Sequence, residues 1–157
     1  MRLPVAVSVL SVVAMLATAA MAQTSPNQQI AQRKGAMNLQ IKYAGPLFGM
    51  ARGAVPYDAR IMQRNADYLA VLTQMPWDDF QPNSFGIPNT RAKDAILKDP
   101  EKFKKLADGL ASDIQKVVAA ARGSDQNAVK SAVQAMGRTC NSCHEGFADF
   151  EFRFKLE

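Results

Sequence analysis

The residues best suited to chemistry are two cysteines and a histidine near the C-terminus, in the segment Cys140-Asn141-Ser142-Cys143-His144. On a helix, two thiols three positions apart lie on one face, and the imidazole follows immediately. A C-x-x-C-H segment is typical of covalent haem attachment, with thioethers to both cysteines and the histidine on the iron. We therefore predict one haem c, covalently held through Cys140 and Cys143, with His144 as the metal ligand.

Other interpretations of the two cysteines explain less of the segment. A thioredoxin-like C-x-x-C requires a βαβ context, which the apolar pattern of this chain does not provide. A zinc site would have only three soft ligands and no second cluster. A disulfide across the two intervening residues is possible in an oxidising compartment, but it leaves the neighbouring histidine, the only one in the chain, unexplained.

The first 22 of the 157 residues have the character of a secretory signal peptide. Arg2 is followed by an uncharged stretch that ends in Ala20-Met21-Ala22, an A-x-A cleavage pattern. An uncleaved membrane anchor is the alternative, because twenty uncharged residues could just span a bilayer. We predict cleavage, export to the periplasm and a single mature domain over residues 23–157, with no membrane attachment after cleavage.

Composition limits the remaining possibilities. With 48% hydrophobic residues the chain is too apolar to be disordered, and 157 residues suffice for one domain. The formal net charge of +5 falls by one when Arg2 is removed, and it favours acidic partners without indicating a nucleic acid.

Helical spacing dominates the mature chain. The clearest apolar stripe advances in steps of three and four residues near the C-terminus and includes both cysteines: Val129, Val133, Met136, Cys140, Cys143 and Phe147. Start and stop signals predict helices over about 25–51, 58–75, 100–122 and 125–147, with a packed loop over 76–98. The fold class is therefore all-α, an antiparallel up-down-up-down four-helix bundle with the haem in its core.

The opposite side of the iron determines the function, and the chain has no second histidine to place there. The candidates are a methionine, water, a gas or nothing. In an up-down-up-down bundle, the start of the first helix lies beside the end of the fourth, which brings Met37 level with His144. Met37 could ligate the iron, cover it as an apolar lid, or simply fill the core.

The chain resembles the class II c-type cytochromes, and most closely the cytochromes c′, from about Gln28 to Phe147. Haem attachment near the C-terminus is the specific feature, since class I cytochromes c carry it near the N-terminus. The resemblance rests on Arg33-x-x-x-Met37, Gly53-x-x-Pro56-Tyr57-Asp58-Ala59, Arg64-Asn65-Ala66, Pro76-Trp77-x-x-Phe80 and the segment from Cys140 to His144.

The resemblance implies a homodimeric periplasmic haem protein with a mostly five-coordinate iron that binds NO and CO. Such proteins are proposed to buffer or carry NO, or to pass electrons to a redox partner that the sequence does not identify. By position, Met37 would line the distal pocket and Arg33 would bond a haem propionate. From its residue type alone, Arg33 is equally well an exposed cation. Ala148 stands where the family usually has a basic residue.

Our first hypothesis is therefore a gas-binding, high-spin haem protein that is not an enzyme. The alternative is a six-coordinate, low-spin electron carrier in which the Met37 sulfur bonds the iron. A peroxidase would need a polar distal acid–base group, and we expect apolar neighbours around Met37. We interpret Trp77 and Phe80 as loop anchors rather than haem contacts. The alternating tail from Phe150 to Leu156 is expected to fold over the haem edge or a dimer neighbour.

Overall fold

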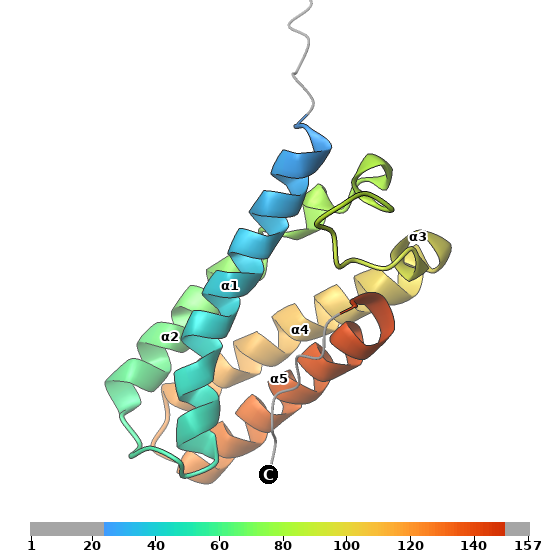
Figure 1. Ribbon diagram of the computed structural model, residues 1–157. Coiled ribbons are helices and arrows are strands. Elements are labelled where there is room, and N and C mark those ends of the chain that lie inside the picture. Colours follow the sequence, from blue (N-terminus) through green and yellow to red (C-terminus); the bar gives the residue numbers. More distant parts are fainter. Residues whose placement is uncertain (1–23, 150–157) are drawn as a thin grey trace, which may run out of the picture.

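The computed structural model describes residues 24–149, which form an antiparallel four-helix bundle, as predicted (Figure 1). The first 23 residues and the Phe-rich tail lie outside the described residues. The four long helices are α1 (Pro26–Ala51), α2 (Ala59–Leu72), α4 (Pro100–Ala121) and α5 (Gln126–Phe147). α1 packs against α2 and α5, and α4 packs against α2 and α5.

Side-chain caps start the helices where the sequence predicted. Ser25 and Gln28 form a capping box at the start of α1. The carboxylates of Asp58, Asp99 and Asp125 accept backbone hydrogen bonds at the starts of α2, α4 and α5. These caps fix the helix boundaries and therefore the level of each apolar stripe in the bundle.

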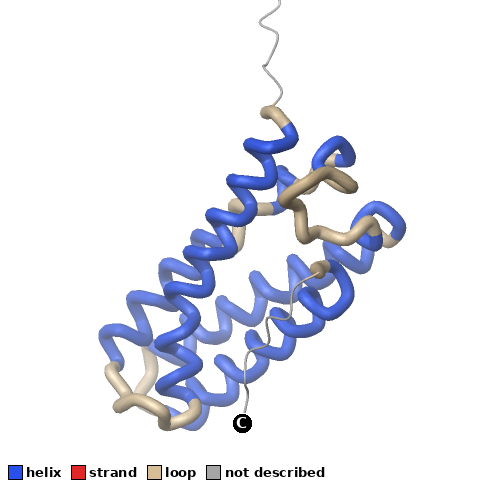
Figure 2. The backbone as a smooth tube through the Cα atoms, viewed as in Figure 1, coloured by secondary structure: helices blue, strands red, loops and turns tan. Residues whose placement is uncertain are grey.

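The connection between α2 and α4 contains more structure than the predicted loop. It forms two 3₁₀ turns, η1 (Trp77–Asp79) and η2 (Pro82–Ser84), and the one-turn helix α3 (Ala95–Lys98). Apart from one isolated antiparallel bridge between Ala92 and Ala148, the described residues consist of helices, turns and loops (Figure 2). None of the helices in this part of the chain has the length and apolar character that a membrane span requires.

The two ends of the bundle differ in how completely the stripes are buried. We call the end where α1 stops and α5 starts the closed end, and the opposite end, where α5 stops, the open end. At the closed end the core is continuous and includes Leu47, Met62, Ile114, Val117 and Val133. At the open end Ile30 and Phe147 are buried, but six other stripe residues are only partly buried: Met37 and Ile41 in α1, Phe103 and Leu106 in α4, Cys140 and Cys143 in α5.

Candidate functional site

A cavity of about 400 Å³ lies where the stripes are incompletely buried. This volume falls within the range of roughly 300–1,000 Å³ that is typical of small-molecule and cofactor pockets. Its walls come from α1, the α2–α4 connection, the start of α4 and the end of α5. They are predominantly apolar and include Ile30, Met37, Ile41, Trp77, Phe80, Ile96, Phe103, Cys143, His144 and Phe147.

Cys140 and Cys143 lie on the inner face of α5 and are recorded as free thiols. Cys143 lines the cavity, and Cys140 lines a smaller adjoining pocket that also contains Met37 and His144. Burial, together with the nearby Cys143, raises the pKa of Cys140 to about 12, and burial raises the pKa of Cys143 to about 11. A thiol that stays protonated at neutral pH is a poor nucleophile, which weakens the thioredoxin-like interpretation.

His144 follows on the next position of α5 and lines both pockets. Its side chain is partly buried, and this burial lowers the pKa of the imidazole. The neutral imidazole is the form that binds a metal ion. The local environment therefore favours the ligand form of His144 at neutral pH.

Met37 lies on α1, across the cavity from α5, and it lines the same two pockets as His144. Ile41, one helical turn further along α1, lines both pockets as well. Met37 and His144 therefore lie at the same level of the bundle, as their distances from the helix ends predicted. The Met37 and Ile41 side chains are only partly buried, because the cavity replaces the neighbour that would otherwise cover them.

Arg33 is not an exposed cation, because its side chain points into the structure and the residue is 4% exposed. Its guanidinium hydrogen-bonds to three residues of the α2–α4 connection: Asp79, Ser84 and Thr90. Burial lowers the pKa of Arg33, and the charge of Asp79 partly offsets this effect. Arg33 also lines the cavity, so it lies within reach of the predicted site.

Trp77 and Phe80 are both loop anchors and cavity walls, so interpreting them as anchors alone was incomplete. The Trp77 Nε1–H donates to the carbonyl oxygen of Thr73 at 2.6 Å. The rings of Trp77, Phe80, Phe103 and Phe147 contact one another in a continuous cluster, with centroids 4.9–6.2 Å apart. The Pro76-Trp77-x-x-Phe80 motif was the sequence signal for this wall.

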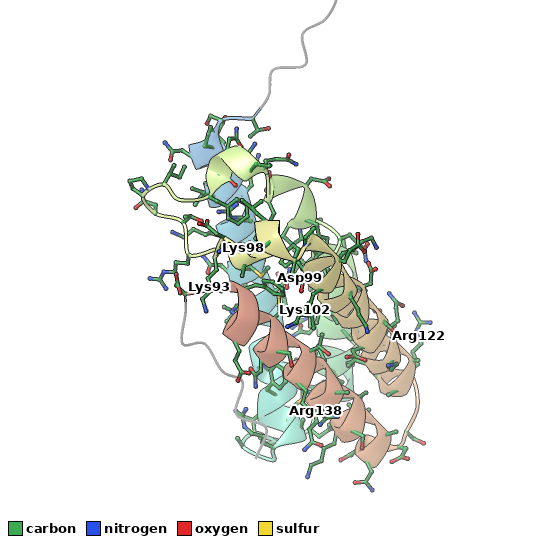
Figure 3. All side chains as sticks on the ribbon, turned by 90° about the vertical axis from the view of Figure 1, so that its right-hand side faces the viewer. Lys93, Lys98, Asp99, Lys102, Arg122 and Arg138 are labelled. Carbon is green, nitrogen blue, oxygen red and sulfur yellow. The ribbon has the colours of Figure 1, made fainter. Side chains whose placement is uncertain are left out.

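The segment before α3 is tied to the last turn of α5. The Lys93 backbone N–H donates to the Phe147 carbonyl at 3.0 Å, and the Asp149 N–H donates to the Arg91 carbonyl at 2.7 Å. The Lys93 Nζ donates to the Glu145 carbonyl at 3.2 Å, which holds this lysine beside α5 (Figure 3). The sequence did not predict that this pairing would bring Arg91 to the cavity wall next to Ala148.

A contact between α4 and α5 lies one residue before the first cysteine. The Thr139 hydroxyl donates to the Asp113 carboxylate at 2.7 Å and so joins α5 to α4. Burial would raise the pKa of Asp113, but hydrogen bonds from Lys116 and Thr139 outweigh it, and the pKa is lowered. This contact fixes the rotation of α5 that presents Cys140 to the interior.

The residues present fit a haem. A flat apolar ring with two carboxylates needs apolar walls, nearby cations, two attachment thiols and an imidazole. The cavity supplies all of these, with Arg33, Lys34 and Arg91 as its cations. An antiparallel four-helix bundle with this site near its C-terminus defines a c-type haem protein of the bundle type.

Comparisons with known proteins agree with this class. A family model described as Cytochrome C' matches residues 28–148. A cytochrome c′ from Cereibacter sphaeroides is 36% identical over 143 residues, which cover 87% of this chain and 93% of the relative. A cytochrome c′ from Rubrivivax gelatinosus is 32% identical over 124 residues, covering 79% and 96% of the two chains.

Solved structures show the same architecture. The crystal structure of cytochrome c′ from Rubrivivax gelatinosus matches with a TM-score of 0.76 and 31% identity, over 80% of this chain and 98% of that one. Cytochrome c prime from Shewanella frigidimarina matches over the same shares with a TM-score of 0.77 and 28% identity. The chain belongs to the cytochrome c′ family, and its cofactor is haem c.

Proposed function

We propose that this protein is a periplasmic haem protein that binds small diatomic gases, NO and CO, at a five-coordinate iron. In this proposal Cys140 and Cys143 hold the haem, and His144 is the proximal ligand. Met37 covers the opposite side as an apolar lid. The observation that carries the proposal is that Met37 and His144 face the same two pockets from different helices.

The chemistry of the α1 wall favours neutral diatomic ligands. When bound, haem supplies an iron with an open coordination position that has affinity for NO and CO. In the smaller pocket that Met37 shares with His144, Met37, Ile41 and Ala44 carry no charge for an anion and offer water at most a weak hydrogen bond. The polar α1 residue of that pocket, Gln40, donates its amide to the Leu72 carbonyl at 3.3 Å. The apolar residues therefore exclude polar competitors while leaving room for a small apolar gas.

The relatives support gas binding without deciding its physiological use. One matching structure is the nitric oxide complex of a mutant cytochrome c prime from Alcaligenes xylosoxidans, which covers 81% of this chain with a TM-score of 0.73 and 27% identity. The role we propose is NO handling, electron transfer, or both, without enzymatic turnover. A peroxidase would need a polar acid–base group beside Met37, and the polar residues that α1 contributes to the two pockets include no histidine or carboxylate: Arg33, Lys34, Asn38 and Gln40.

The second candidate is a low-spin electron carrier with the Met37 sulfur on the iron. Its specific support is the same placement of Met37, whose thioether can serve as a ligand as well as a lid. Family membership does not separate the two candidates, because both require the same helical bundle, the same attachment cysteines and the same proximal histidine.

Titration of the reduced holoprotein with CO and with NO tests the proposal. We expect stoichiometric spectral changes with both gases. A reduced spectrum that neither gas changes would contradict gas binding and favour the electron-carrier alternative.

We also propose export and dimerisation. Within residues 24–149, four of the six exposed large hydrophobic side chains lie on α1, on α2 or just after α2: Leu39, Tyr68, Val71 and Met75. The edge contact between Tyr43 and Tyr68 joins the two helices beneath this surface. A second copy related by twofold symmetry would cover it. Val71→Glu should convert the dimer to a monomer in analytical ultracentrifugation.

Export has a separate test: the mass of the mature protein should be that of a chain whose first residue is Gln23. A wild-type monomer or a retained leader would contradict these expectations.

A further inference from the structure

The most heavily bonded side chain at the open end is Arg33, and all its hydrogen-bond acceptors are uncharged oxygens of the α2–α4 connection. We propose that Arg33 is a positioning residue that holds residues 77–90 in place as the wall of the haem cavity. In this role it acts through the loop. The inference rests on the proposed function only for the identity of the group behind the wall.

Most N–H donors of the Arg33 guanidinium make hydrogen bonds to the α2–α4 connection. Nη1 donates to the Asp79 carbonyl at 3.0 Å and to the Ser84 hydroxyl at 2.7 Å. Nη2 donates to the Ser84 carbonyl at 3.1 Å and to the Thr90 hydroxyl. A guanidinium has five N–H donors, and a carboxylate bound through a fork takes two of them. Bidentate binding of a propionate by the two terminal nitrogens would therefore break bonds to the loop.

Two aromatic rings enclose the same guanidinium. The Arg33 Cζ atom lies 4.9 Å from the centroid of the Phe80 ring and 5.4 Å from that of Phe85. The Phe80 ring packs on Phe103, and the Phe103 ring packs on Phe147. Phe147 belongs to a small buried cluster with Phe85 and Ile96, and Cys143 packs against this cluster. Arg33 thus fixes one edge of the aromatic wall whose other edge touches a haem-attachment residue.

The ties that Arg33 makes are long-range, since its partners lie 46–57 residues further along the chain. The backbone bonds around η1 and η2 are local turns, such as Ser84 N–H to the Gln81 carbonyl. Local turns give the loop its shape but do not attach it to α1. Loss of the Arg33 bonds should therefore free the wall while leaving the four helices intact.

A loosened wall has a consequence at the haem. Water entering the cavity stabilises the more highly charged oxidised iron, so the reduction potential falls. Removal of a nearby positive charge would lower the potential too. A variant that loosens the loop without altering charge is therefore needed to separate the two effects.

Thr90→Val is that variant, because it keeps every charge and removes the Thr90 hydroxyl, which accepts from Arg33 and also from the Ala92 N–H at 3.3 Å. We would compare it with Arg33→Met, with Arg33→Lys as the conservative variant, and with Lys34→Met as the control. Lys34 is the neighbouring cation on the cavity wall, and it makes a single exposed bond to the loop, from Nζ to the Asn89 carbonyl at 3.3 Å. The measurements are amide hydrogen exchange of residues 77–90 and the reduction potential, both on the holoprotein.

We expect exchange in the loop to rise about tenfold or more in Arg33→Met, in keeping with the loss of charged hydrogen bonds. Thr90→Val and Arg33→Lys should show a smaller rise in the same amides, and the potential should fall in Thr90→Val as well. Lys34→Met should leave loop exchange at the wild-type level.

Two results would overturn the inference. One is wild-type loop exchange in Arg33→Met. The other is a potential that falls in Arg33→Met and Lys34→Met but not in Thr90→Val, because that pattern indicates a charge effect on the haem. CO titration of the wild type is run alongside. A wild type that binds no gas would reject the proposed function, while the exchange comparison would still decide the role of Arg33.

Discussion

At the closed end of the bundle, side chains from all four helices fill the interior by themselves, whereas at the open end the same helices leave a cavity. Leu47, Met62 and Val133 are fully buried at the closed end. Met37, Ile41 and Cys140 continue the same stripes at the open end but are only partly buried. The contrast indicates that the closed end is stabilised by packing alone and that the open end is completed by haem.

The largest effect should follow from removing the attachment thiols. Cys140→Ser combined with Cys143→Ser should abolish covalent haem, because thioethers can form only at these two residues. Mass spectrometry of the denatured protein would show the chain without the mass of a haem. Ser142→Ala, an exposed change between the two cysteines, is the control and should retain it. Covalent haem in the double variant would contradict the assignment.

The closed end can be tested with Leu47→Ala. The Leu47 side chain is 0% exposed, and removing it should lower the free energy of unfolding by about 2–5 kcal/mol. The haem absorption spectrum should stay unchanged, because Leu47 lines neither haem pocket. Urea unfolding followed by circular dichroism, with absorption recorded in parallel, measures both. A changed haem spectrum would show that the two ends are coupled more tightly than we infer.

At the open end, Met37→Ala should change the kinetics of gas binding more than it changes stability, the reverse of Leu47→Ala. Removing the lid should speed CO association by about tenfold, equivalent to roughly 1.4 kcal/mol of barrier, with a smaller loss of stability than Leu47→Ala. Flash photolysis of the CO complex gives the rate. Met75→Ala, at an exposed methionine after α2, is the matched control and should leave it unchanged. An unchanged rate in Met37→Ala would contradict the lid.

The smallest effect concerns the contact that orients the cysteine-bearing face of α5. Asp113→Asn should lower stability at neutral pH by about 1 kcal/mol, the typical net value of one hydrogen bond. Because the folded pKa of Asp113 is lowered, its contribution is complete above the unfolded pKa of about 3.9 and is lost as pH falls through the folded pKa.

Urea titrations of the wild type and of Asp113→Asn at several pH values measure this difference. The gap in unfolding free energy should be constant near neutrality and should narrow below pH of about 4. A difference in unfolding free energy that widens under acid conditions would show that ionised Asp113 is not the source of this pH dependence.

The fold was predictable because its determinants are local. Caps such as Ser25 and Asp99 set the starts of helices, and stripes with three- and four-residue steps set the faces that are buried. The C-x-x-C-H segment was equally local. Even Met37 could be placed, since in an antiparallel bundle the distance from a helix end fixes the level of a residue.

The remainder of the site depends on contacts that no local pattern encodes. The residue type of Arg33 left an exposed cation open, but the side chain is buried and its observed partners belong to a connection 46–57 residues away. The short elements η1, η2 and α3 were not predicted, because one-turn helices leave no periodic signal. The bridge between Ala92 and Ala148 likewise depends on two segments that meet only in the folded chain.

The absorption spectrum of the purified ferric holoprotein tests the coordination state that underlies the proposed function. If Met37 is a lid and the iron is five-coordinate, the spectrum will be high-spin and will lack a long-wavelength Met-to-iron charge-transfer band. A low-spin spectrum with that band, lost in Met37→Ala, would contradict the account and identify the protein as a His/Met electron carrier.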